Sequence, residues 1–247
     1  MITFFYHIGK YFLFMGKVLK KPQKANIFIK DLFFEIEKLG INSIIIVFII
    51  SIFMGAVITL QTAYNLEMPL IPLYVVGLGT RDSMFLEFSS TIIALILSGK
   101  VGANIASEIG TMKIREQIEA LDMMGVRSES HLVLPKIIAA IFSFPLLTLF
   151  SMFVGIWGGY LAVYFTGAIP IDNYIYGTHY YFIPFYITYS LIKMVVFAII
   201  ISTIPAYQAY YISGGALEIG VASTKAVVYS SILILFFNVV LTQILLS

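Results

Sequence analysis

Residues 98–135 read SGKVGANIASEIGTMKIREQIEALDMMGVRSESHLVLP and form a charged island between apolar segments. Ionised side chains are costly inside hydrocarbon, so we expect the island to lie outside the bilayer, between two membrane spans. Its helix-forming middle makes it a candidate contact site for a soluble partner. The charged residues of the island are Lys100, Glu108, Lys113, Arg115, Glu116, Glu119, Asp122, Arg127 and Glu129.

The composition around this island is that of an integral membrane protein. The 247 residues are 60% hydrophobic and 11% charged, and the mean hydropathy is +0.97, whereas a soluble domain is about half apolar and about a quarter charged. Cysteine is absent, which excludes disulfides, a thiol nucleophile and a zinc–cysteine site. His7, His131 and His179 are scattered without metal-ligand spacing.

Five segments are long and apolar enough to cross a bilayer as helices of about 20 residues, so the fold class is an all-α membrane protein. The predicted spans are residues 41–64, 84–99, 137–164, 183–207 and 226–246. A partly embedded stretch is a candidate around residues 69–79, and Pro145 is expected to bend the third span.

The basic residues predict the orientation of these spans. With the N-terminus inside, every lysine and arginine except Arg81 and Lys193 falls in a cytosolic segment, as the positive-inside rule requires. Arg81 falls in an outer loop and Lys193 within a span. We therefore expect a cytoplasmic N-terminus and a C-terminus on the other side of the membrane.

The N-terminal region, residues 1–40, mixes lysines with aromatic residues and resembles no secretory signal peptide. This pattern predicts an amphipathic helix lying in the membrane interface; the alternative is an ordinary cytosolic tail. The membrane domain would then be residues 41–247. The lysines concerned are Lys10, Lys17, Lys20, Lys21, Lys24 and Lys30.

Within the island, apolar residues recur at roughly helical spacing between Gly110 and Gly125, which predicts one short amphipathic helix parallel to the membrane. Glu119-Ala120-Leu121, three residues, Gly125 and then Leu134-Pro135 resemble the coupling signature of ABC permeases, with a shorter glycine-to-proline spacing. The alternative is a solvated helix that only links two spans. The predicted ATPase contacts are Glu108, Met112, Arg115, Glu116, Glu119, Asp122 and Gly125.

The stretch Ser98-Gly99-Lys100-Val101-Gly102 is not a phosphate-binding loop, because it lacks the preceding glycine and the Ser or Thr that binds magnesium. We expect no cofactor in this chain, and a separate ATPase would bind ATP and Mg²⁺.

Two blocks of sequence together resemble the MlaE (YrbE-type) permeases of MCE-associated ABC lipid transporters. The first runs from Ser98 to Pro135, and the second comprises Tyr207–Tyr211, Gly214–Ala216, Gly220–Ala222, Thr224–Val228 and Leu241-Thr242. The resemblance covers about residues 40–247. It implies a homodimeric permease in the bacterial inner membrane, an ABC ATPase, a periplasmic MCE-domain protein, in many members a STAS-domain subunit, and a phospholipid substrate, with no nucleic acid.

Glu87 and Lys193 are ionisable residues inside predicted spans, which makes them candidate functional residues. The family commonly has Arg-Glu-Leu-Gly-Pro where this chain has Leu86-Glu87-Phe88-Ser89-Ser90, so only the carboxylate is retained. We expect both residues to line a lipid cavity, where the ammonium can meet a lipid phosphate. The alternative is a structural ion pair or a lysine reaching outward to the interface.

Other classes of protein stay open on the sequence alone. An intramembrane lipid-modifying enzyme would need a nucleophile, base or metal cluster near the spans, and the sequence offers none. A non-transporting scaffold would not require Glu87 and Lys193 in the bilayer. The Gly155–Gly159 pair fits either a dimer interface or packing within one subunit.

Overall fold

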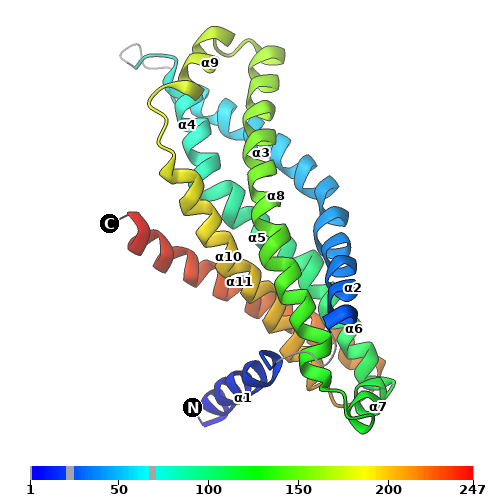
Figure 1. The fold of residues 1–247 in the computed structure, drawn as a ribbon. Helices are drawn as coiled ribbons and strands as arrows, with labels where there is room; N and C mark the ends of the chain where they lie inside the picture. The colour runs from blue at the N-terminus through cyan, green and yellow to red at the C-terminus, as the bar shows by residue number, and fades with distance from the viewer. Residues whose placement is uncertain (1, 21–24, 67–70, 247) are drawn as a thin grey trace. The chain divides into compact units, whose positions relative to one another are not determined.

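The computed structural model describes residues 2–20, 25–66 and 71–246, and these contain helices and no strands (Figure 1). The all-α prediction is therefore confirmed. The chain divides into two compact units. The first comprises Met1–Asn42, Ala94–Ser143 and Val196–Val240, and the second comprises Ser43–Ile93, Phe144–Val195 and Leu241–Ser247.

The prediction of five membrane spans is confirmed. Among the described residues, five helices are long and apolar enough to cross a bilayer, and most are longer than the sequence predicts. They are Ile27–Asn65, Val75–Ile114, Ser128–Thr166, Phe185–Tyr210 and Ala216–Leu246.

The N-terminal region begins with α1 (Ile2–Val18) and α2 (Ala25–Glu35). A π-helical turn, η1 (Ile36–Gly40), and a 3₁₀ turn, η2 (Ile41–Ser43), join α2 to α3 (Ile44–Asn65) without a break. Phe14 of α1 is buried, and its ring lies 5.2 Å from that of Tyr210, centroid to centroid. Lys21 and Lys24 lie outside the described residues, and the interfacial placement of residues 1–40 stays a prediction.

The second span differs from its predicted limits. It is a continuous helix built from α4 (Val75–Ser83), η3 (Met84–Ile92, π-helical), α5 (Ile93–Leu97), η4 (Ser98–Gly102, π-helical) and α6 (Ala103–Ile114). Val101, Ile105 and Ile109 are buried and stand one helical turn apart. This apolar stripe carries the helix past residue 99, well into the charged island. Residues 69 and 70 of the candidate embedded stretch lie outside the described residues.

The island itself holds two helices where the sequence predicts one. After α6, Glu116 takes a left-handed conformation with φ of 57°. The short helix α7 (Gln117–Met123) follows, and α8 (Ser128–Thr166) begins the third span and continues through Pro145. The single helix predicted between Gly110 and Gly125 is therefore divided at Arg115 and Glu116, because the left-handed residue interrupts the helical hydrogen-bond pattern.

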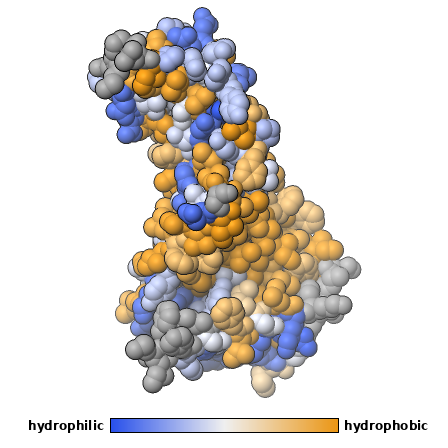
Figure 2. All heavy atoms as spheres, turned by 90° about the vertical axis from the view of Figure 1, so that its left-hand side faces the viewer, coloured by the Kyte–Doolittle hydropathy of each residue, from blue (hydrophilic) through white to orange (hydrophobic). Residues whose placement is uncertain are grey.

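The remaining helices are α9 (Ile171–His179), α10 (Phe185–Tyr210) and α11 (Ala216–Leu246). α11 leaves large apolar side chains exposed, among them Ile232, Phe236 and Val239. Figure 2 shows broad hydrophobic surface on the viewed face of the molecule. Such surface is expected of helices that contact lipid or another membrane subunit.

Glycines bring α3 and α8 into close contact in the second unit. A Cβ atom on Gly55 would lie 1.8 Å from the carbonyl oxygen of Gly155, and one on Gly158 would lie 2.3 Å from that of Ile52. Small residues allow helix backbones to approach this closely. A Cβ atom on Gly159 would likewise lie 2.3 Å from the Tyr174 hydroxyl. Gly155 and Gly159 thus both serve packing within the subunit, one of the two alternatives left open above for this pair.

A Gly55→Ala substitution is expected to destabilise the protein, because the backbone oxygen of Gly155 cannot move without separating the two helices. Overpacking of this kind costs about 1–3 kcal/mol. Thermal unfolding in detergent measures the change. Gly99→Ala is the matched control, since a Cβ there meets nothing within 4 Å. Equal melting temperatures for the two variants would contradict the close α3–α8 contact.

Candidate functional site

Glu87 and Lys193, the two predicted intramembrane charges, form an ion pair in the second unit. The Nζ atom of Lys193, on α10, lies 2.9 Å from Oε1 of Glu87, on η3. The same ammonium donates to the carbonyl oxygen of Leu86 at 3.3 Å. The structure therefore brings together two residues more than a hundred positions apart in the sequence.

Three hydroxyl groups complete the surroundings of this pair. Nζ of Lys193 donates to the Tyr189 hydroxyl at 3.0 Å and lies 3.5 Å from Oγ1 of Thr242. The two hydroxyls are 2.7 Å apart. The hydroxyl of Thr91 donates to Oε2 of Glu87 at 3.0 Å. Sequence reasoning missed these residues because neutral hydroxyls inside apolar helices give no charge signal.

The two members of the pair differ in accessibility. The side chain of Lys193 is fully buried, whereas that of Glu87 is 41% exposed. An ammonium has three protons to donate, and four acceptors of the protein surround this one. The surface that the pair offers to another molecule is therefore the carboxylate of Glu87, held in place by the lysine behind it.

The predicted ATPase contacts fall into an exposed and a half-buried group. Glu108 and Met112, on α6, are half-buried, whereas the others are exposed on or beside α7: Arg115, Glu116, Glu119, Asp122 and Gly125. Ile118 holds α7 against the protein, being 1% exposed. Met123 and Met124 are also strongly exposed here, and the sequence analysis did not single them out as contacts.

Two contacts fix α7 to its neighbouring helices. Glu119 pairs with Lys113 of α6, and the hydrogen bond from this lysine lowers the pKa of Glu119. The Ser128 hydroxyl donates to Oδ1 of Asp122 at 2.6 Å. Asp122 therefore holds the first residue of α8, and its carboxylate is already engaged within the protein.

Glu108 belongs to a group of four charges that the sequence analysis did not connect. Its Oε2 atom accepts from Lys38 at 2.6 Å and from Lys136 at 2.8 Å. Lys136 also pairs with Glu35. The sequence did contain one sign of this group, namely a lysine immediately after Leu134-Pro135, at the start of an apolar segment. Nothing in the sequence identified the partners of that lysine.

Arg81 is a second residue whose role the sequence did not predict. It lies in α4 and is 2% exposed, although the positive-inside count placed it in an outer loop. Its guanidinium pairs with Asp82 at 2.8 Å. It also donates to the carbonyl oxygens of Thr178 at 3.1 Å and Tyr180 at 2.8 Å. Arg81 thereby fixes the segment between α9 and α10.

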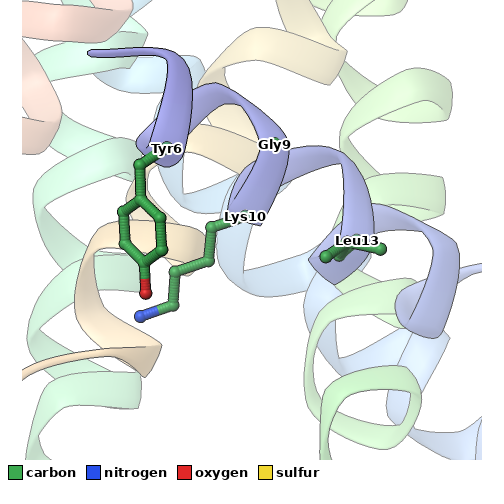
Figure 3. Close-up of a pocket in the computed structure, with 4 residues that line it drawn as sticks. All are labelled: Tyr6, Gly9, Lys10 and Leu13. Carbon is green, nitrogen blue, oxygen red and sulfur yellow. The ribbon is translucent and has the colours of Figure 1, made fainter. Parts of the chain in front are cut away.

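A shallow hollow lies on α1, lined by Tyr6, Gly9, Lys10 and Leu13 (Figure 3). The Tyr6 and Lys10 side chains extend to the same side of the helix. The Lys10 ammonium lies 3.7 Å from the centroid of the Tyr211 ring, a cation–π distance. None of the predicted site residues lines this hollow.

Within residues 2–20, 25–66 and 71–246, no group of three or more His, Asp or Glu side chains could hold a metal ion. The polar groups described above are ion pairs and hydroxyls. They can bind and orient charged groups.

Known proteins are similar to this chain along nearly its whole length. Residues 32–244 match the family described as Permease MlaE. A probable ABC transporter permease protein of Rickettsia bellii is 36% identical, over 96% of this chain and 91% of the relative. The intermembrane phospholipid transport system permease protein MlaE of Haemophilus influenzae is 28% identical, over 99% and 94%. The chloroplastic protein TRIGALACTOSYLDIACYLGLYCEROL 1 of Arabidopsis thaliana is 28% identical, over 92% of this chain and 65% of the relative. The chain therefore belongs to the MlaE permease family of multi-pass membrane proteins.

Proposed function

We propose that this protein is the permease subunit of an ATP-driven transporter that moves phospholipids or similar lipids between the inner and outer membranes of a bacterium. The observation that carries this proposal is the Glu87–Lys193 pair within two candidate spans. Ionisable groups at membrane depth are costly and generally functional. The Haemophilus relative is named for intermembrane phospholipid transport, which supports the substrate class.

The pair forms the polar wall of the lipid site in this proposal. Glu87 is the exposed member, so it contacts the polar head group, while Lys193 holds the carboxylate in position. The Tyr189 and Thr242 hydroxyls keep the lysine in place. A carboxylate wall suits a head group that carries a cationic amine, and the lipid phosphate lies further from it.

The energy source is a separate ABC ATPase, which binds ATP and Mg²⁺ and contacts this chain through α7. The exposed charges Arg115, Glu116 and Glu119 and the exposed Met123 and Met124 support this placement. A homodimeric permease, a periplasmic MCE-domain protein and a STAS-domain subunit complete the proposed assembly. The N-terminus is cytoplasmic, the C-terminus periplasmic and the membrane the bacterial inner membrane.

Replacing Arg115 by glutamate and Glu116 by lysine tests the ATPase contact and leaves the Lys113–Glu119 pair intact. Reversed charges at an interface meet like charges, which costs on the order of a few kcal/mol. We expect the ATPase to be lost from the purified complex, while the permease keeps its helical circular dichroism. Asp172→Lys is the control, because Asp172 is an exposed carboxylate on α9. A normal yield of complex and normal ATP hydrolysis in the double variant would refute the assignment of α7.

A further inference from the structure

The four-charge cluster in the first unit joins three segments that are distant in the sequence. Glu35 ends α2, Lys38 lies in η1, Glu108 in α6 and Lys136 in α8. Lys136 contacts both carboxylates, and Lys38 contacts the carboxylate of Glu108 as well. One continuous set of ion pairs therefore connects α2, α6 and α8.

The centre of this cluster is buried and its edge is accessible. The side chains of Lys136 and Glu35 are 4% and 8% exposed, whereas those of Lys38 and Glu108 are 25% and 31% exposed. Buried ion pairs gain strength from the low dielectric but lose the hydration of both ions. Replacing such a pair by apolar residues is often neutral or stabilising, so burial of these charges is not explained by stability alone.

The unequal hydrogen bonding of Glu35 supports the same conclusion. Its Oε1 atom pairs with Lys136, but its Oε2 atom is buried and has no hydrogen-bond partner among the described residues. A buried polar atom without a partner is destabilising and calls for an explanation. The arrangement of this cluster fixes Lys136 against two helices at once, at a cost in stability.

The position of the cluster relative to α7 suggests what it does. α6 and α8 are the helices immediately before and after α7. Lys113 joins α6 to α7 through Glu119, and Asp122 joins α7 to the start of α8 through Ser128. Lys136 and Glu108 then connect α6 directly to α8, about two turns from α7. Together, the three contacts connect α6, α7 and α8 to one another.

We propose that Glu35, Lys38, Glu108 and Lys136 form a charged brace that makes α2, α6 and α8 move as one body when α7 is displaced. They are positioning residues for the coupling of ATP hydrolysis to lipid movement. Without the brace, α7 can shift while α6 and α8 move separately, and the displacement is lost before it reaches the spans. This inference rests on the proposed docking of an ATPase at α7.

Lys136→Met combined with Glu35→Gln tests the brace. Methionine keeps the aliphatic length of the lysine, and removing both buried charges together leaves neither without its partner, while Glu108 keeps its contact with Lys38. We expect the ATPase to remain bound and to hydrolyse ATP, while the lipid transferred between fluorescent donor and acceptor vesicles per ATP falls about tenfold, in the range of measured coupling effects. Lys136→Arg should retain coupling, because a guanidinium can contact two carboxylates. The control is Lys17→Met with Glu129→Gln, which removes another ion pair of the same unit, 3.0 Å long.

The measured outcomes distinguish a brace from an ion-pair cluster that only stabilises the fold. A purely structural cluster lowers the melting temperature of the variant and reduces hydrolysis and transfer in the same proportion, and that result overturns the proposal. Unchanged transfer per ATP in the Glu35→Gln/Lys136→Met variant overturns it as well.

Amide hydrogen exchange of the permease alone, in lipid nanodiscs, gives a readout without the ATPase. Faster exchange in both α6 and the first turns of α8 is expected for the Glu35→Gln/Lys136→Met variant, and unchanged exchange there overturns the brace. Failure of the ATPase to bind the unmodified permease would instead contradict the proposed function.

Discussion

A Lys193→Met variant is expected to be destabilised, whereas a Glu87→Leu/Lys193→Met double variant is expected to fold normally and to lose its bound lipid. The single change leaves the Glu87 carboxylate without its ammonium partner inside a candidate span. Removing one member of a fully buried pair costs about 3–5 kcal/mol, whereas replacing both members by apolar residues is often neutral. The partial exposure of Glu87 lowers the cost of the single change here.

The double variant therefore separates the structural role of the pair from its role in binding. If the pair serves only to join η3 to α10, the double variant should assemble, hydrolyse ATP, carry lipid and restore the outer-membrane barrier. If Glu87 forms the wall of the lipid site, assembly and hydrolysis persist, but the lipid that copurifies decreases and the barrier is not restored. Mass spectrometry of lipid extracted from the purified complex measures the difference.

Glu87→Gln tests more finely whether the lipid head group contacts the Glu87 carboxylate. The amide keeps the shape of the carboxylate and removes its charge, so lipids with a cationic amine should be depleted relative to anionic lipids. Lys225→Met serves as the control, because Lys225 is an exposed lysine near the start of α11. An unchanged lipid profile in both Glu87→Gln and the double variant would leave the pair as structural.

An Arg81→Met variant is expected to unfold at a much lower temperature than the unmodified protein. The substitution leaves the Asp82 carboxylate and the carbonyl oxygens of Thr178 and Tyr180 without their buried donor. Loss of one partner from a buried charged network costs about 3–5 kcal/mol. Arg81→Lys should recover only part of this, since one ammonium cannot reproduce the planar set of donors.

The segment between α9 and α10 should become susceptible to proteolysis in Arg81→Met. Tyr181 within it has a φ of 45°, a left-handed conformation that tertiary contacts must maintain. Thermal unfolding in detergent and limited proteolysis measure the two effects. Arg127→Met is the control, because Arg127 is exposed and such surface changes usually stay within about 0.5 kcal/mol. An unchanged melting temperature and an intact segment in Arg81→Met would contradict this role.

Hydropathy and charge were sufficient to predict the membrane class, the five spans and the presence of two ionisable groups within them. These are local properties, because the cost of a charge in hydrocarbon depends on the residue and on its apolar neighbours in the chain. The limits of the second span were wrong because its core-facing stripe, including Val101, Ile105 and Ile109, continues beyond the apolar segment. Helix continuation there depends on packing, which hydropathy does not report.

Only the tertiary structure determined which charges meet and which of them are accessible. Lys136 and Glu35 lie 101 positions apart, and their pairing depends on the rotation of each helix about its axis and on the separation of the helices. Nothing in the sequence distinguished Glu87 from Lys193. In the structure, packing buries the lysine and leaves the carboxylate exposed. The physical reason is that an apolar helix can turn any of its faces toward the protein interior. Close contacts between helices, such as Gly55 on Gly155, then fix which face points inward.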